Sequence, residues 1–401
     1  MKLTDLAALA QPSGEKIVLL VLDGLGGLPM KPGGRTELEA ARTPNLDELA
    51  REGGCGLHEP VAPGVTPGSG PGHLSLFGFD PLHYRIGRGV LEALGIEFNL
   101  EPGDIAARGN FCTVDGNGAV TDRRAGRLPT EESARLCDLL TAIRLPGAEL
   151  FVRPVKEHRF LFVIRSDEPS ASAIADTDPE REGTAPLDVR AATPESEPAA
   201  RIARAWVEGA REALAGEPRA NMVLLRGFAS LPDWPRFPEV FRLRPLAAAA
   251  YPMYRGVARL VGMEAVSVDD TPEALVTELQ QRYDDFDFFF LHIKGTDKAG
   301  EDGDFEHKVR VIESVDAVIP RLREAGAGVL LVTGDHSTPA RLRSHSWHPV
   351  PFLVHGGAGR TECAAGFGES ECARGTLGLR RGCDLMPLAM ARAGRLGRFG
   401  A

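Results

Sequence analysis

Two adjacent side chains that can bind a metal, Asp335 and His336, follow the apolar run 329–332. A carboxylate and an imidazole are ligands that divalent metals accept. Another carboxylate, Asp23, follows a second apolar run at residues 17–22. Taken alone, an Asp–His pair is more often structural than catalytic, and an Asp after a strand often only caps a turn. These residues alone are therefore open to two interpretations, metal binding and a structural role.

Further ligand types follow the apolar run 286–293. The acidic segment 294–304 contains Asp297 and Glu301, and His345 adds another imidazole. Together with the residues above, these side chains form an oxygen and nitrogen ligand set large enough for two divalent metals. Two such metals can stabilise the attacking and leaving oxygens of a phosphoryl transfer. No Gly-x-x-x-x-Gly-Lys-Ser/Thr stretch is present, so a P-loop nucleotide site is not supported.

A hydroxyl suited to nucleophilic chemistry is provided by Ser69. The surrounding segment 63–72 is dense in Gly and Pro, which predicts irregular structure up to Gly72 and a short helix from Leu74. Backbone amides and the helix dipole favour a phosphate near such a helix start. The plain alternative is a surface turn with a helix-capping serine. The metal ligands elsewhere favour a serine that a metal activates.

The apolar runs predict the scaffold that positions these residues. Continuous apolar runs indicate buried parallel strands, and ligands bind where such strands end. Strands that alternate with polar loops and helices predict a doubly wound α/β domain. We expect strands at 17–22, 222–227, 263–268, 286–293, 329–332 and 350–354, and helices at 197–214, 247–261, 272–283, 306–325 and from 384.

In residues 85–235 the apolar runs are less continuous and arginines cluster, which predicts an inserted domain, with 1–84 and 236–401 forming the core. Within the insertion, 166–199 is expected to be a long loop. The segment 122–127 places Arg123, Arg124 and Arg127 within six residues. Surface arginines are usually only solvated, but such a cluster can also bind a phosphate or carboxylate through paired hydrogen bonds.

Composition narrows the function classes. The chain has 401 residues, 43% of them hydrophobic and 25% charged, and a formal charge of -10, which argues against a general nucleic-acid or membrane binder. No window approaches the roughly 18 apolar residues of a membrane span, and the first residues lack a signal-peptide layout. The six cysteines are scattered, so we expect free thiols in the cytoplasm. Cys363 and Cys372 are near enough in sequence to pair, without other support.

With these motifs in view, the whole chain resembles the archaeal-type cofactor-independent phosphoglycerate mutases of the alkaline phosphatase superfamily. The motifs that carry the resemblance are Val21-Leu22-Asp23-Gly24, Pro67-Gly68-Ser69 with His73, Gly78-Phe79-Asp80-Pro81, Gly87-Arg88-Gly89, Asp122-Arg123-Arg124-Ala125-Gly126-Arg127, Lys294-Gly295-Thr296-Asp297-Lys298-Ala299-Gly300, Gly334-Asp335-His336-Ser337, and His345 before Pro349-Val350-Pro351.

The resemblance implies an alkaline phosphatase-like core with two metals and an inserted α+β domain that caps the substrate. Mn²⁺ is the expected metal, with Mg²⁺, Co²⁺ or Zn²⁺ as alternatives, and no bisphosphoglycerate is needed. One metal would be held by Asp23, Ser69, Asp335 and His336, and the other by Asp297, Glu301 and His345. Many relatives have His where Glu301 stands, and a carboxylate there favours a harder metal. His348 is an alternative ligand, although a supporting role fits it better.

The implied reaction interconverts 3-phosphoglycerate and 2-phosphoglycerate in glycolysis and gluconeogenesis, through a phosphoserine on Ser69. Arg123, Arg124 and Arg127 would bind the glycerate, and Lys294 would lie near the transferring phosphate. The alternatives are a metal-dependent phosphomonoesterase, another phosphomutase, or a metal-binding relative without catalysis. The expected partner is the small substrate, with no nucleic acid or membrane, and a homo-oligomer is an option.

Overall fold

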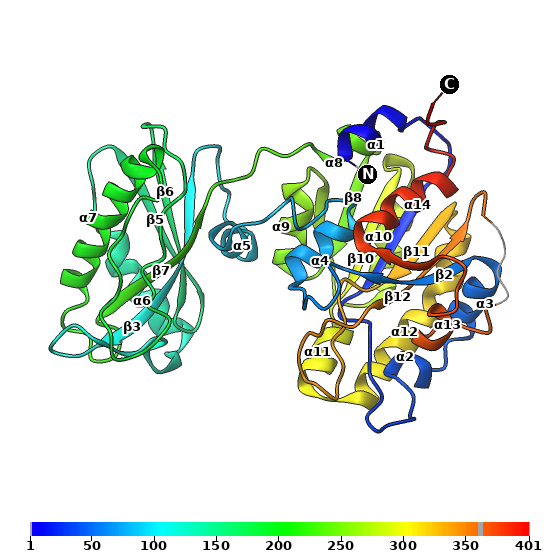
Figure 1. Cartoon of the computed structure of the whole chain (residues 1–401), viewed down its shortest axis with the longest axis horizontal. Coiled ribbons are helices and arrows are strands. Elements are labelled where there is room, and N and C mark those ends of the chain that lie inside the picture. The colour runs from blue at the N-terminus through cyan, green and yellow to red at the C-terminus, as the bar shows by residue number, and fades with distance from the viewer. Residues whose placement is uncertain (1, 360–363, 401) are drawn as a thin grey trace. The chain divides into compact units, whose positions relative to one another are not determined.

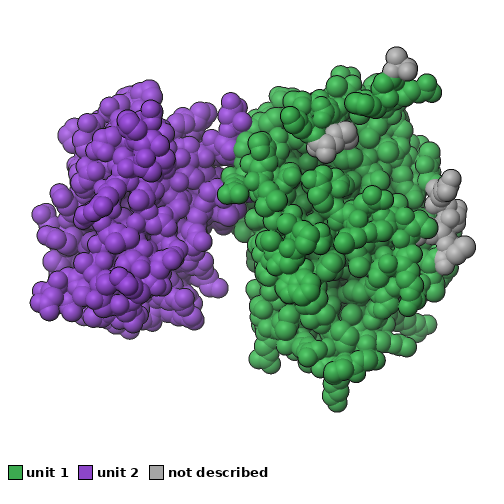
Figure 2. Space-filling model, viewed as in Figure 1, with its two compact units in different colours: residues 1–85, 234–401 green, residues 86–233 purple. Residues whose placement is uncertain are grey.

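The chain forms two compact units, which Figure 2 colours separately. The computed structural model describes residues 2–359 and 364–400. Unit 1 comprises Met1–Arg85 and Trp234–Ala401, and unit 2 comprises Ile86–Asp233. The chain therefore leaves unit 1 once and returns to it once, so unit 2 is an insertion into unit 1.

Unit 1 is built on an eight-stranded sheet in the order β13-β2-β12-β11-β1-β10-β8-β9 (Figure 1). Its strands are β1 (Ile17–Leu22), β2 (Gly54–Glu59), β8 (Pro245–Ala249), β9 (Glu264–Ser267), β10 (Phe288–Ile293), β11 (Val329–Thr333), β12 (Val350–Gly356) and β13 (Gly378–Arg381). Strand β1 is parallel to both β10 and β11, with Leu22 opposite Ile293 and Val21 opposite Thr333. The polar segments that follow these three strands consequently start at one edge of the sheet.

Helices cover both faces of this sheet, so the α/β prediction is confirmed. On one face, β1 residues such as Leu20 share a core with α3 (Pro44–Glu52), α10 (Pro272–Arg282) and α12 (Phe305–Glu324). On the other face, the ring of Phe290 lies 5.0 Å from that of Phe77. The remaining helices of unit 1 are α1 (Leu3–Leu9), α2 (Glu37–Ala40), α4 (Ser69–Leu76), α8 (Phe237–Phe241), α9 (Pro252–Leu260), α11 (Gly295–Asp302), α13 (Glu369–Cys372) and α14 (Leu385–Arg392).

Three local predictions in unit 1 are wrong. Helix α4 begins at Ser69 rather than after Gly72, because a proline in the first helical turn replaces an amide that has no partner inside the helix. The start of the helix expected at 247–261 is strand β8, and α9 begins only at Pro252. The acidic segment expected as a loop contains helix α11.

Unit 2 is an α+β unit around an antiparallel five-stranded sheet, in the order β4-β3-β6-β5 with β7 paired to β3. Its elements are α5 (Arg88–Gly95), β3 (Ile105–Val114), β4 (Val120–Asp122), α6 (Thr130–Thr141), β5 (Ala148–Lys156), β6 (Arg159–Ser166), α7 (Glu197–Ala213) and β7 (Met222–Ala229). In its core, Trp206 of α7 stacks on Phe162 of β6 with ring centroids 4.1 Å apart. The expected long loop connects β6 to α7.

Among the described residues, no helix combines the length and apolar character that crossing a membrane requires. The thiols of Cys112, Cys137 and Cys383 are buried. The sequence-based pairing of Cys363 with Cys372 falls on a residue outside the described ranges.

Candidate active site

Three fully buried side chains form a first cluster where β1 and β11 end. Asp23 follows β1 directly, and Asp335 and His336 come shortly after β11. Asp23 Oδ1 lies 3.3 Å from His336 Nε2, and Asp335 Oδ2 lies 3.1 Å from the same nitrogen. One ligand atom from each residue lies within 4.8 Å of the others. Three donors at this spacing can share one cation.

The remaining oxygens of this cluster are occupied by the protein. Asp335 Oδ1 accepts a hydrogen bond from the Gly24 amide at 3.1 Å. Asp23 Oδ2 lies 3.1 Å from His292 Nε2 and 3.2 Å from Lys294 Nζ. By contrast, Asp23 Oδ1 and Asp335 Oδ2 are buried oxygens with no hydrogen-bond partner in the described part of the chain. Because unsatisfied buried carboxylate oxygens are costly, these two oxygens fit a metal ligand role.

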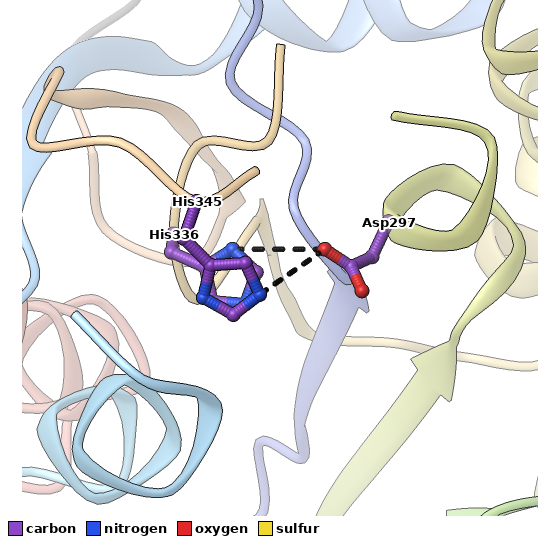
Figure 3. Close-up of side chains that lie close together, drawn as sticks. All are labelled: Asp297, His336 and His345. Atoms are coloured by element: carbon purple, nitrogen blue, oxygen red, sulfur yellow. Dashed lines mark ion pairs between the residues drawn. The ribbon is translucent and has the colours of Figure 1, made fainter. Parts of the chain in front are cut away.

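A second cluster joins Asp297 of α11 to His336 and His345 (Figure 3). Asp297 Oδ1 lies 3.6 Å from His345 Nε2 and 4.0 Å from His336 Nδ1. The two imidazole rings stack with centroids 3.6 Å apart. Glu301 reaches the edge of this cluster, with its Oε1 3.9 Å from His345 Nε2, and its side chain is 55% exposed.

Hydrogen bonds decide which nitrogen of each imidazole faces these clusters. The Thr338 hydroxyl donates to Asp297 Oδ1 at 2.6 Å and lies 2.9 Å from His336 Nδ1, so we assign the proton of His336 to Nδ1. His345 Nδ1 lies 3.0 Å from the Pro67 carbonyl, which can only accept. Each Nε2 therefore presents a lone pair, as metal-binding imidazoles do. His336 then belongs to the first cluster, and His345 faces Asp297.

Ser69 lies against the first cluster as the first residue of α4. Its hydroxyl oxygen is 3.3 Å from His336 Nε2. One turn later, His73 Nδ1 lies 2.8 Å from the Ser69 carbonyl and 3.2 Å from Asp335 Oδ2. The helix start places partial positive charge beside the serine, where it would stabilise an anion.

The charges of the first cluster are set by its buried partners. Burial opposes ionisation of Asp23, but the His292 hydrogen bond and the Lys294 charge hold the pKa of Asp23 well below its usual range. Burial and the charge of Asp23 oppose ionisation of Asp335, yet His336 and His73 keep the pKa of Asp335 below its ordinary value. Burial lowers the pKa of His336. The cluster thus presents two carboxylates and a neutral imidazole, which is the protonation state that metal binding needs.

Lys294 connects the two clusters. Its Nζ lies 2.5 Å from Asp297 Oδ2 and 2.7 Å from the Tyr254 hydroxyl, in addition to its contact with Asp23. Burial opposes its charge, but Asp23 and Asp297 raise the pKa of Lys294 above its ordinary value. Tyr254 of α9 stacks on His292 at a centroid distance of 3.9 Å. Tyr254 and His292 had no part in the predicted site, because no motif in α9 or β10 distinguishes them from packing residues.

The three predicted substrate-binding arginines lie in unit 2, at a turn after β4, and line a cavity of about 270 Å³. Arg123 is already engaged, because its Nε and Nη2 bond the Asp178 carboxylate at 2.9 and 2.8 Å. Arg124 and Arg127 are exposed. The other titratable residues that line this cavity are Arg108, Glu157, His158, Arg159 and Arg226.

The turn that carries Arg124 and Arg127 has an unusual backbone. Ala125, Gly126 and Arg127 have φ angles of 46°, 64° and 50°, a left-handed run that costs free energy at the non-glycine positions. The Asp122 carboxylate holds the turn by accepting from the amides of Arg124 at 2.7 Å and Gly126 at 2.6 Å. A strained turn fixed in this way is more typical of a binding loop than of a solvated surface.

Comparison with known proteins identifies relatives along the whole chain. The family model for 2,3-bisphosphoglycerate-independent phosphoglycerate mutase matches residues 50–220. A probable 2,3-bisphosphoglycerate-independent phosphoglycerate mutase of Thermus thermophilus is 50% identical over 99% of this chain and 98% of its own. Among solved structures, the PH0037 protein of Pyrococcus horikoshii has a TM-score of 0.78 at 32% identity, covering 96% of this chain and 99% of its own. The cofactor-independent phosphoglycerate mutase of Thermoplasma acidophilum has a TM-score of 0.75 at 29% identity, covering 95% and 100%. This chain belongs to the 2,3-bisphosphoglycerate-independent phosphoglycerate mutase family.

Proposed function

We propose that the protein interconverts 3-phosphoglycerate and 2-phosphoglycerate through a phosphoserine at Ser69, without bisphosphoglycerate. The supporting observation is the position of the Ser69 hydroxyl, 3.3 Å from His336 Nε2. This hydroxyl stands at a helix start, beside a cluster with two unpartnered carboxylate oxygens. Nucleophile, anion-stabilising amides and metal ligands thus converge, as phosphoryl transfer requires.

The proposed ligands form two sets. Asp23, Ser69, Asp335 and His336 would hold one divalent metal, and Asp297, Glu301 and His345 the other. The unpartnered oxygens and the free Nε2 lone pairs support this division. When bound, the metals would lower the pKa of the serine hydroxyl and offset phosphoryl charge. We favour Mn²⁺, with Mg²⁺, Co²⁺ or Zn²⁺ as alternatives, because carboxylates outnumber imidazoles in the two sets.

The side chains of the site would act in two phosphoryl transfers. The Ser69 hydroxyl would lose its proton as its oxygen forms a bond to phosphorus. The bond from phosphorus to the glycerate oxygen breaks in the same step, and that oxygen gains a proton. The glycerate stays bound and reorients. Its other hydroxyl then loses a proton as it bonds to phosphorus, while the bond from phosphorus to Ser69 breaks and the serine oxygen regains a proton. Lys294 stays charged beside Asp23 and Asp297, so it can contact a phosphoryl oxygen during both transfers.

For the carboxylate of the substrate, we propose Arg124 and Arg127, with Arg123 in a supporting role because Asp178 already binds it. Arg124→Met and Arg127→Met should each raise KM about 10-fold or more, the usual cost of losing a charge-assisted hydrogen bond. The matched variant Arg123→Met should instead lower the melting temperature, because it leaves the buried Asp178 with only the longer 3.4 Å ion pair to Arg226. Steady-state kinetics and thermal melts check this division. A KM increase in Arg123→Met with an unchanged melting temperature would contradict it.

The test of the proposed reaction compares two assays on one preparation. An enolase-coupled assay without bisphosphoglycerate should detect 2-phosphoglycerate, while a free-phosphate assay should give a far lower rate. Chelation should abolish the activity and added Mn²⁺ should restore it. Phosphate release faster than 2-phosphoglycerate formation would favour the phosphomonoesterase alternative. Metal binding without transfer from any small phosphate ester would favour a non-catalytic relative. For an enzyme of glycolysis or gluconeogenesis, we propose a cytoplasmic setting.

A further inference from the structure

A buried cation lies behind the first cluster. Lys308, in the first turns of α12, is 0% exposed, and the segments it contacts come from both ends of the chain. Its Nζ donates to the carbonyl oxygens of Gly24 at 2.8 Å, Gly26 at 3.1 Å and Thr338 at 2.9 Å. An ammonium group has three donors, so these carbonyls use its full capacity.

The three carbonyls belong to the two loops that carry the first cluster. Gly24 follows Asp23, and Thr338 comes shortly after His336. The loops also contact each other directly, because the Thr338 amide lies 3.2 Å from the Gly24 carbonyl and 3.1 Å from the Gly26 carbonyl. Lys308 therefore adds a charged connection at the place where the loops meet. Its backbone belongs to α12, which packs in the core of unit 1 and gives the connection a rigid base.

A second buried side chain, Glu37, binds the segment that follows Thr338. Glu37, also 0% exposed, accepts a hydrogen bond from the Ala340 amide at 2.7 Å through Oε1. A buried ammonium is costly to keep, and an apolar residue on α12 would avoid that cost. All three hydrogen bonds of Lys308 go to these two loops. We therefore attribute this buried lysine to a role in fixing the geometry of the loops.

We propose that Lys308 is a positioning residue for the first metal site, acting by fixing the loop of Asp23 to the loop of Asp335 and His336. This inference rests on the proposed function. The 3.3 Å separation of Asp23 Oδ1 from His336 Nε2 depends on the spacing of these loops. Substitution of a residue that orients metal ligands in this way typically lowers metal affinity by 10- to 100-fold.

The test replaces Lys308 by Met, which has similar length and no charge. Titration calorimetry of chelator-treated protein with Mn²⁺ should show the affinity of the tighter site reduced about 10- to 100-fold. The matched control is Lys16→Met. Lys16 lies just before β1, at the end of that strand away from Asp23. Its Nζ donates to the carbonyls of Tyr283 and Phe286. Its loss should lower the melting temperature and leave Mn²⁺ affinity unchanged.

If Lys308→Met does not fold, Lys308→Gln keeps an amide donor and should show an intermediate loss of Mn²⁺ affinity. Mn²⁺ affinity in the Lys308 variants equal to wild type, or reduced no more than in Lys16→Met, would overturn the positioning role and leave the metal site intact. A wild-type protein that binds no Mn²⁺ would overturn the proposed metal site, and the role of Lys308 with it. These outcomes separate failure of the inference from failure of the proposed function.

Discussion

Ser69→Ala is expected to lower the rate of 2-phosphoglycerate formation at least about 10⁴-fold, because removal of a covalent nucleophile eliminates the reaction path rather than one contribution to it. Two other hydroxyls of the site are already engaged by the protein, because that of Thr338 donates to Asp297 and that of Tyr254 lies 2.7 Å from Lys294 Nζ. The enolase-coupled assay measures the loss directly. Acid quenching during turnover, followed by intact-mass analysis, should find a phosphoryl group on the wild-type chain and none on the variant.

The chain offers a matched control for this substitution. Ser75 lies in the same helix, is 1% exposed, and its hydroxyl has no hydrogen-bond partner in the described ranges. Ser75→Ala should therefore keep both the activity and the phosphoryl group. Full activity in Ser69→Ala, or a phosphoryl group on another residue of that variant, would refute the nucleophile assignment.

The central strands could be predicted because their burial is complete. Residues 17–22, 288–293 and 329–333 are buried on both faces of the sheet, and such strands appear in sequence as uninterrupted apolar runs. Their parallel pairing then places the following residues at one edge. The proximity of Asp23 to Asp335 follows from β1 and β11 being neighbours, which local sequence alone does not specify.

Helices α4 and α11 could not be predicted from periodicity, because they bury glycine and polar residues. A side chain at Gly72 would place its Cβ 2.5 Å from the Asp335 carbonyl oxygen, so this glycine reflects close packing and not a loop. In α11, the buried residues include Thr296 and Asp297, which an apolar pattern does not register. The close packing of these two helices also places Ser69 of α4 and Asp297 of α11 at the site.

The supporting residues were hidden for a different reason. His292 lies within the apolar run of β10, and Tyr254 lies in a helix with an ordinary amphipathic pattern. Lys308 resembles any surface lysine of a helix. Their roles depend on contacts with residues 30 or more positions away, such as the bond from Lys308 to the Thr338 carbonyl and the contact between His292 and Asp23. Ligand types can therefore be found from sequence, whereas the residues that orient them require the fold.

Asp335→Asn should change metal affinity far more than the stability of the apo-protein. The variant keeps an acceptor for the Gly24 amide but loses a charge, so Mn²⁺ affinity should fall at least about 100-fold and activity about 10³-fold. Without metal, burial and the charge of Asp23 disfavour ionisation of Asp335, but His336 and His73 favour it and keep the pKa of Asp335 below its ordinary value. The variant loses the unfavourable and the favourable contacts together, so the free energy of unfolding of its chelated form should stay within about 1 kcal/mol of wild type.

Asp316→Asn supplies the contrasting control, because the carboxylate of Asp316 is buried but fully used by the fold. Its oxygens accept from the Leu46 amide and from the Asn45 side chain, each at 2.8 Å. An amide group there would face a donor, so Asp316→Asn should lose about 1 to 2 kcal/mol of stability and keep its Mn²⁺ affinity. Calorimetric titration and denaturant unfolding of the chelated proteins measure both properties. If Asp335→Asn behaved like Asp316→Asn, Asp335 would serve the fold. Loss of Mn²⁺ affinity in a variant whose apo form keeps its stability would instead mean that the metal, and not the fold, requires this carboxylate.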